Sequence, residues 1–229
     1  MVGEAREKKS EALVNARDEI LTRIQRSFPP TARSSAEEHA AIPREYIQAG
    51  TLDAEARLDL FEERLREYGT EVYRGTAAQL PETVAMAMNA AGVTRLAIAE
   101  DIGPSWLPGA ASGAALSFIR DENLSYEILD RTEGILTTCA VAIALTGTII
   151  LRHGRTGRRA ITLIPDYHLC IVRASQVVET VPEAIRELES PGRSPITMIS
   201  GPSATADIEM TRIKGVHGPR RLGVILIVA

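Results

Sequence analysis

The sequence predicts an α/β fold in which helices cover both faces of one mixed β-sheet. Strand and helix patterns alternate from residue 70 onward, which is typical of βαβ units and a parallel sheet. Residues 140–173 instead carry successive apolar runs separated by short turns, which favours antiparallel pairs. The chain has 229 residues, 45% of them hydrophobic, and can bury one large core. We therefore expect an N-terminal helical extension over residues 1–69 and an α/β domain over residues 70–229.

The N-terminal extension begins with a helical pattern. Over residues 4–28, apolar side chains recur on one face, and two prolines end the helix (Leu13, Ala16, Ile20 and Ile24; Pro29 and Pro30). The polar segment that follows contains Pro43 and predicts a loop or a surface arm. A second helical pattern ends at Gly69 (Leu58, Phe61, Leu65 and Tyr68).

The elements of the α/β domain follow in order. Apolar runs predict strands at 71–74, 95–99, 140–145, 148–152, 160–164, 168–173, 196–199 and 224–228. Helical spacing predicts one helix over residues 81–91 and another after Ser175, whose apolar face carries Val178, Val181, Ile185 and Leu188. Trp106, the only tryptophan, is expected to be a core anchor rather than a lid.

Composition excludes several classes of protein. A net charge of -4 gives no general attraction for nucleic acid or for an anionic membrane surface. No apolar run approaches the roughly twenty residues that span a bilayer, and the N-terminus lacks the apolar stretch of a secretory signal, so we expect a cytoplasmic protein. Cys139 and Cys170 lie in apolar runs and are expected to be reduced core thiols, and we expect neither a metal nor a cofactor.

The loop over residues 197–219 is the first candidate site. Gly201 and Pro202 favour a tight turn, and the hydroxyls of Ser203 and Thr205 can cap it, so that backbone amides converge on an anionic ligand. The carboxylates of Asp207 and Glu209 repel an anion unless they face away, bind a hydroxyl or pair with a basic residue. A structural interpretation also remains open, in which the polar side chains only cap a short helix and His217 packs under a turn.

A second turn extends this candidate site. Thr146, Gly147 and Thr148 form a Gly-containing turn between two predicted strands, and we expect it to lie beside the Gly201 turn at one rim of the sheet. In open α/β folds such cradles lie at the carboxyl ends of strands. His217 is flanked by two glycines and is the best candidate for ligand contact or proton transfer (Gly215 and Gly218).

The remaining polar candidates are weaker. His168 begins an apolar strand and is expected to be a satisfied core residue, whereas His39 and His153 are expected to be exposed. The basic turn over residues 152–159 either clamps an anion or acidic partner, or is a solvated hairpin tip; both interpretations stay open.

Four motifs between residues 145 and 219 carry a resemblance. They are L-T-G-T-I-I-L at 145–151, R-x-x-x-x-x-P-x-x-H at 159–168, S-G-P-S-x-T-x-D-I-E at 200–209 and G-V-H-G-P at 215–219. In this order they resemble the lactate utilization protein C family, which carries the LUD domain. The family pattern often has an acidic residue before the T-G-T turn, where this chain has Leu145. If that carboxylate belongs to a site, the chain has lost part of it.

The resemblance implies both a fold and a role. The fold is Rossmann-like and of the type shared by NagB, ribose-5-phosphate isomerase and CoA transferases. The role is in the oxidation of L-lactate to pyruvate, beside two iron–sulfur partner proteins. The family component holds no cluster of its own, which agrees with a count of two cysteines.

Two functional hypotheses follow. The first is an accessory, non-catalytic component of the lactate-oxidising system that binds a small anionic ligand. The alternative is a stand-alone enzyme of CoA-transferase or sugar-phosphate isomerase type, with Glu209 and His217 as catalytic residues and Glu133 as another nominal nucleophile. We favour the first, because no nucleophile, base and orienting group stand out together.

Overall fold

The computed structural model describes residues 16–28, 35–109, 116–154, 156–188, 194–206, 212–215 and 217–228. The chain divides into two compact units, Met1–Tyr46 and Ile47–Ala229. The domain boundary expected after residue 69 stays a prediction, although helix α3 (Ala54–Glu67), which precedes it, belongs to the second unit.

The first unit contains two described helices. Residues 16–27 are helical, which agrees with the described part of the helix expected over residues 4–28. The segment expected to be a loop contains helix α2 (Ser35–Ala41), so that expectation was wrong there. The large apolar side chains of the first helix are exposed (Ile20, Leu21 and Ile24).

A six-stranded parallel sheet forms the centre of the second unit. Its strands lie in the order β1 (Glu71–Gly75), β12 (Arg221–Ile227), β7 (Tyr167–Arg173), β4 (Gly134–Thr138), β2 (Arg95–Ile98) and β3 (Ser117–Arg120). Every neighbouring pair is parallel. Buried on both faces, the central strands are almost wholly apolar, as parallel sheets require.

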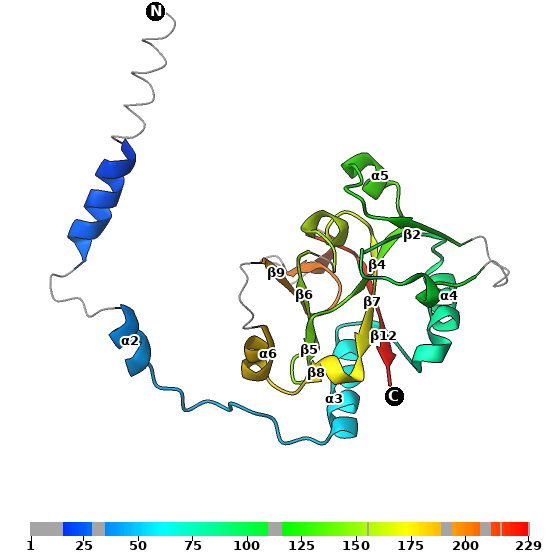
Figure 1. Ribbon diagram of the computed structural model, residues 1–229, viewed down its shortest axis with the longest axis horizontal. Coiled ribbons are helices and arrows are strands. Elements are labelled where there is room, and N and C mark those ends of the chain that lie inside the picture. Colours follow the sequence, from blue (N-terminus) through cyan, green and yellow to red (C-terminus); the bar gives the residue numbers. More distant parts are fainter. Residues whose placement is uncertain are drawn as a thin grey trace, which may run out of the picture. The chain divides into compact units, whose positions relative to one another are not determined.

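Helices cover both faces of this sheet (Figure 1). On one face, Val84 and Met88 of α4 (Leu80–Ala91) pack in a cluster with Ile225 of β12. On the other, Phe61 and Leu65 of α3 share a second cluster with residues of the same strands. Gly92, at φ 65°, ends α4 in the left-handed conformation that glycine favours. The predicted fold class is confirmed.

A second, four-stranded sheet lies on the α3 face of the first. Its order is β8 (Val177–Val178), β5 (Val141–Ile143), β6 (Thr148–Arg152) and β9 (Ile196–Ile199), and helix α6 (Val181–Leu188) packs against it. The antiparallel pairs are β5–β6 and β6–β9. The antiparallel strands expected within the main sheet therefore form a separate sheet.

The described part of the second unit also contains several short elements. They are α5 (Tyr126–Asp130), the 3₁₀ turns at Ala77–Gln79, Pro104–Trp106, Arg159–Thr162 and Ala174–Gln176, and the antiparallel pair β10 (Ala204–Ala206) and β11 (Arg212–Lys214). The strand expected at 160–164 is wrong, because this apolar run folds as the 3₁₀ turn Arg159–Thr162.

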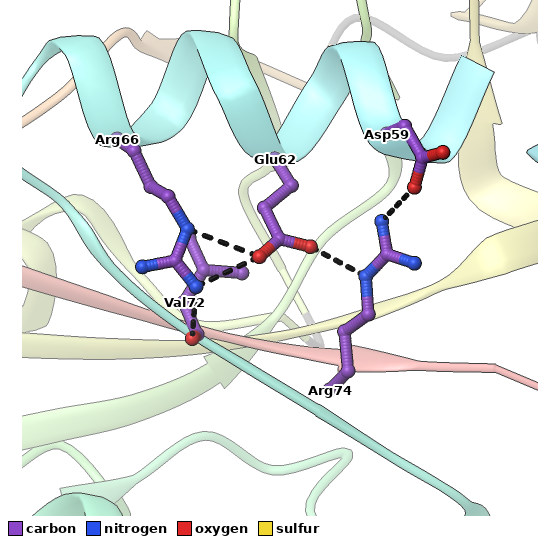
Figure 2. Close-up of polar contacts among 5 residues, drawn as sticks. All are labelled: Asp59, Glu62, Arg66, Val72 and Arg74. Atoms are coloured by element: carbon purple, nitrogen blue, oxygen red, sulfur yellow. Dashed lines mark hydrogen bonds and ion pairs between the residues drawn. The ribbon is translucent and has the colours of Figure 1, made fainter. Parts of the chain in front are cut away.

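A charged network fixes α3 to the edge strand β1 (Figure 2). Glu62 accepts hydrogen bonds from Nε and Nη2 of Arg66, at 3.0 and 2.7 Å, and from Arg74 on β1. Arg74 also donates to Asp59, and Arg66 donates to the carbonyl of Val72 at 3.1 Å. The network holds the C-terminal half of α3 in place, and that half contacts the turns described below.

The two cysteines and Trp106 occupy the environments expected of them. Cys139 and Cys170 are free and buried, and a hydrogen bond with Cys170, together with burial, raises the pKa of the Cys139 thiol. Trp106 is half-buried against the core, and the Arg173 guanidinium lies 5.0 Å from its ring centroid. None of the helices in the described ranges combines the length and the apolar character that crossing a bilayer requires.

Candidate functional site

The turns around Gly147 and Gly201 lie side by side. Strand β6 begins where the first turn ends, and Ile149 pairs with Ile199 at the end of β9. The hydroxyls of Thr148 and Ser200 are 2.8 Å apart. Residues more than fifty positions apart in the sequence therefore meet at one rim of the second sheet.

Both turns press against the C-terminal end of α3. A Cβ on Gly147, at φ 56°, would lie 2.9 Å from Cβ of Arg64, and one on Gly201, at φ 86°, would lie 2.6 Å from Cβ of Tyr68. These positions need glycine for backbone conformation and for space. The Thr148 side chain is buried, and its hydroxyl contacts those of Thr146 and Ser200. The Thr146–Thr148 turn thus supports the Gly201 loop from behind.

The Gly201 loop also lines a hollow of about 250 Å³. Three of the four sequence motifs line it, and we call it the motif hollow. Its lining residues are Arg159, Thr162 and His168, residues 197–204, residues 217–219, and Leu222. Gly201 and Ser203 belong to this lining, whereas Thr146, Gly147 and Thr148 do not.

Backbone hydrogen bonds close the two loops around the motif hollow. The Ser203 amide donates to the Pro219 carbonyl, and the Gly215 amide donates to the Ser203 carbonyl, both at 2.9 Å. The Ser203 hydroxyl accepts from the His217 amide at 3.2 Å. Ser203 therefore joins the loops, and its own amide is already engaged. The Ser203 hydroxyl proton and the His217 side chain take no part in these three hydrogen bonds, and both residues line the hollow.

Basic and neutral groups face the motif hollow. Arg159 is exposed, donates to the Thr162 hydroxyl at 3.3 Å, and has no acidic partner within the described ranges. His168 is buried with Nε2 2.8 Å from the Thr137 hydroxyl. Burial lowers the pKa of His168 to about 4, so its imidazole is neutral near pH 7. The structure agrees with the core interpretation of His168 and also places this residue in the lining of the hollow.

The motif hollow lies at the amino ends of the parallel strands. His168 and Leu222 are the second residues of β7 and β12 and pair in register. The cradle was instead expected at the carboxyl ends, where open α/β folds commonly bind ligands. The loops fall at the amino ends because β9, which precedes them, belongs to the second sheet rather than the parallel one.

The comparisons with known proteins agree with these motifs. The family model of the LUD domain matches residues 58–227. The chain belongs to the LUD domain family. This chain is 43% identical over 216 residues to "Lactate utilization protein C" of Deinococcus radiodurans. The match covers 93% of this chain and 95% of that protein. A protein of the same name from an Exiguobacterium species is 26% identical, over 93% of this chain and 96% of its own length.

A solved structure supports the same assignment of fold. The crystal structure of a DUF162 family protein from Deinococcus radiodurans superimposes with a TM-score of 0.66 at 39% sequence identity. The likeness covers 78% of this chain and the whole of the other. The LUD domain described above therefore has the architecture of a solved relative.

Other candidate residues of the LUD domain fall at or beyond the described ranges. Asp207 and Glu209 lie outside them, and for Thr205 only the backbone is described, pairing with Ile213 across β10 and β11. Because Ala204–Ala206 is a strand, the interpretation in which these residues begin and cap a short helix is wrong there. Leu145, 45% exposed, also lies outside the lining of the motif hollow.

The remaining sequence candidates have structural partners. Glu133 accepts hydrogen bonds from the amides of Thr94 and Arg95, which lower the pKa of its carboxyl despite some burial. Arg158 of the basic turn pairs with the buried Asp121 carboxylate at 2.9 Å, so the solvated-tip interpretation does not hold for it. Arg152 donates to the Leu188 carbonyl. Of the basic turn's described arginines, Arg159 alone reaches the motif hollow.

Three residues that line the motif hollow were not expected to form a site together: Arg159, His168 and Thr162. Arg159 was one of several arginines in a basic turn, and His168 was assigned to the core. Thr162 lay in an expected strand, which gave no reason to place its hydroxyl beside Arg159. Arg159 and His168 are the first and last residues of one quoted motif, nine positions apart, and this was the available signal for them. Thr162 is an unspecified position of that motif and had no such signal. No group of three metal-binding side chains gathers among the described residues.

Proposed function

We propose that this LUD domain protein is an accessory component of a cytoplasmic system that oxidises L-lactate to pyruvate. Similarity over 93% of the chain to a protein named for lactate utilization is the observation that carries the proposal. Oxidation of lactate releases two electrons. The two iron–sulfur partner proteins that the family resemblance implies would take these electrons. The chain itself has two cysteines, fewer than the four that commonly hold an iron–sulfur cluster.

Within this role, the motif hollow binds a small anionic ligand. The exposed guanidinium of Arg159 supplies the positive charge, and Ser203 and His217 supply polar contacts at the mouth. A volume of about 250 Å³ suits a small molecule rather than a macromolecule. Thr146, Gly147 and Thr148 act from behind, by supporting the Gly201 loop. Thr205, Asp207 and Glu209 stay candidates for ligand contact, and Glu209 and His217 are the candidates for proton transfer.

Growth on L-lactate tests the role. Deleting the gene should abolish growth on L-lactate as sole carbon source and leave growth on pyruvate intact, and the wild-type gene should restore it. Arg159→Met should restore it poorly, whereas Arg95→Met, which removes an exposed arginine at the start of β2, should restore it fully. A deletion strain that grows normally on L-lactate would remove the proposed role.

Sulfate binding tests the motif hollow separately. Isothermal titration calorimetry with sulfate, a general small anion, should show weak binding. Arg159→Met should lower the affinity for sulfate about tenfold, because the loss of one hydrogen bond to a charged group weakens binding by about that factor. Binding that is equal in wild type, Arg159→Met and Arg95→Met would place the anion elsewhere.

A further inference from the structure

A second group of polar side chains lies at the opposite, carboxyl edge of the parallel sheet. Asp101 follows β2, Thr138 ends β4, Arg173 ends β7, and Trp106 lies in the turn after Asp101. We call these four residues the carboxyl-edge cluster. None of them belongs to the motif hollow.

The order of the strands gives this edge its significance. The next strand of this sheet after β2 is β3, on one side, whereas the next strand of this sheet after β4 is β7, on the other side. The connections thus diverge between β2 and β4, which makes this the switch point of the sheet. Open α/β sheets bind ligands in the crevice outside the carboxyl ends of the strands at such a point. Asp101 and Thr138 stand on its two sides.

One carboxylate oxygen of Asp101 has no hydrogen-bond donor. The Thr138 hydroxyl donates to Oδ2 of Asp101. Oδ1 is buried and accepts no hydrogen bond within the described structure. A buried carboxylate oxygen is almost always paired in a folded protein, so an unpaired one at a switch point indicates a position for a ligand's donor.

The loop that carries Asp101 is held rigidly. Arg120, at the end of β3, donates from Nη1 to the carbonyls of Ala99 and Glu100, at 3.2 and 2.8 Å. Its Nη2 donates to the carbonyl of Ile102 at 2.9 Å. These bonds fix the backbone on both sides of Asp101. A carboxylate positioned in this way pays little ordering cost when a ligand binds.

Arg173 supplies a positive charge to the same edge. Its guanidinium stacks over the Trp106 ring and makes no ion pair with an acidic side chain within the described ranges. A stacked arginine keeps its N–H groups in a plane that suits bidentate recognition of a carboxylate. The cluster therefore offers one acceptor for a hydroxyl or amino donor, and one cation for an acid group.

We propose that the carboxyl-edge cluster binds a small hydroxycarboxylate, whose hydroxyl donates to Oδ1 of Asp101 and whose carboxylate pairs with Arg173. The choice of a hydroxyl over an ammonium group rests on the proposed function, because an unpaired carboxylate oxygen accepts from either donor. L-Lactate carries both required groups and is the probe. Pyruvate lacks the hydroxyl, and L-alanine replaces it with an ammonium group.

Trp106 reports on this site directly, because it is the only tryptophan in the chain. Titration of the full chain with L-lactate should change its fluorescence with saturation, and pyruvate should bind about tenfold more weakly. Arg173→Met should weaken lactate binding about tenfold, as expected for loss of a charge-assisted contact. Asp101→Asn should remove the preference for lactate over pyruvate. Arg95→Met and Asp130→Asn, at exposed positions outside the cluster, are the matched controls and should bind as wild type does.

Several outcomes would overturn the inference. These are the absence of a saturable lactate signal, equal lactate affinity in wild type and Arg173→Met, or tighter binding of L-alanine than of L-lactate. Arg173 is exposed, so its variant tests the site even if Asp101→Asn fails to fold, which circular dichroism would reveal. A deletion strain that cannot use lactate, combined with no binding at Trp106, would retain the proposed function and reject this site. Binding at Trp106 without a growth defect would do the reverse.

Discussion

The hydroxyl of Thr137 lies 2.8 Å from Nε2 of His168, between two neighbouring strands of the parallel sheet. Both side chains are buried, yet His168 also lines the motif hollow. The contact satisfies one ring nitrogen in the neutral imidazole. The stability of the sheet therefore depends on the protonation state of His168, a residue that lines the candidate site.

The first prediction concerns pH. Burial lowers the pKa of His168 to about 4 in the folded protein, against about 6.5 when unfolded, so acid protonates the unfolded chain first. The stabilisation is complete above pH 6.5 and is lost as pH falls from 6.5 toward 4. Between pH 7 and pH 5 the free energy of unfolding should fall by about 2 kcal/mol through this residue. Urea unfolding at both pH values should show a smaller fall in His168→Gln, and an equal fall would refute the prediction.

The second prediction concerns the contact between Gly201 and α3. Gly201→Ala should destabilise the protein by about 2–3 kcal/mol, because the left-handed backbone and the close approach to Tyr68 both oppose a Cβ. Gly92→Ala is the matched control. Gly92 has a similar positive φ but no atom within 4 Å of a Cβ, so its cost should be about 1 kcal/mol. Equal unfolding midpoints in urea would mean that Tyr68 moves aside freely.

Local patterns in the sequence were sufficient to predict the turn at Gly201, but not what packs against it. Gly-Pro marks a turn wherever it occurs. The contact with Tyr68 joins residues far apart in the chain, and no local signal encodes it. The same limit explains the wrong strand at 160–164. Its apolar run suits a strand, but Arg158 reaches Asp121, 37 residues away, and fixes the start of a 3₁₀ turn instead.

The carboxyl-edge cluster shows what topology adds to a sequence. An acidic residue directly after a predicted strand was the signal that could have identified Asp101. Its meaning depends on the strand order, because only a switch point brings the end of β2 beside the end of β4 with no connection crossing between them. Because antiparallel strands were expected in the main sheet, the order of its parallel strands was not predicted. The placement of the antiparallel strands in a second sheet is a tertiary outcome that period and turn chemistry do not encode.

The third prediction concerns the segment before α3. The amides of Gly50 and Leu52 donate to Glu183 and Glu179, at 3.1 and 2.7 Å, and Arg186 donates to the carbonyl of Gln48 at 2.6 Å. A Cβ on Gly50 would lie 2.2 Å from a carboxylate oxygen of Glu179. Gly50→Ala should therefore release this segment.

Limited proteolysis measures the release. A protease of broad specificity should cut Gly50→Ala several-fold faster between residues 47 and 53, with the sites mapped by mass spectrometry. Global stability should change by less than about 1 kcal/mol, because the segment adds little to the core. Gly109→Ala is the control, since a Cβ there meets nothing within 4 Å. Unchanged cleavage in Gly50→Ala would show that these hydrogen bonds do not hold the segment.

The fourth prediction compares two adjacent glutamates on α3. Glu62 is 20% exposed and accepts from both Arg66 and Arg74, so it joins the helix to β1, as Figure 2 shows. Glu63 is 62% exposed, and its nearest basic atom is 3.8 Å away on Arg64. Glu62→Gln should lower the free energy of unfolding by about 1 kcal/mol, since partly buried networks exceed isolated surface pairs. Glu63→Gln should change it by less than about 0.3 kcal/mol. Urea unfolding of both variants decides the matter, and because Glu62 is partly shielded, about 0.5 M salt should reduce the difference without removing it.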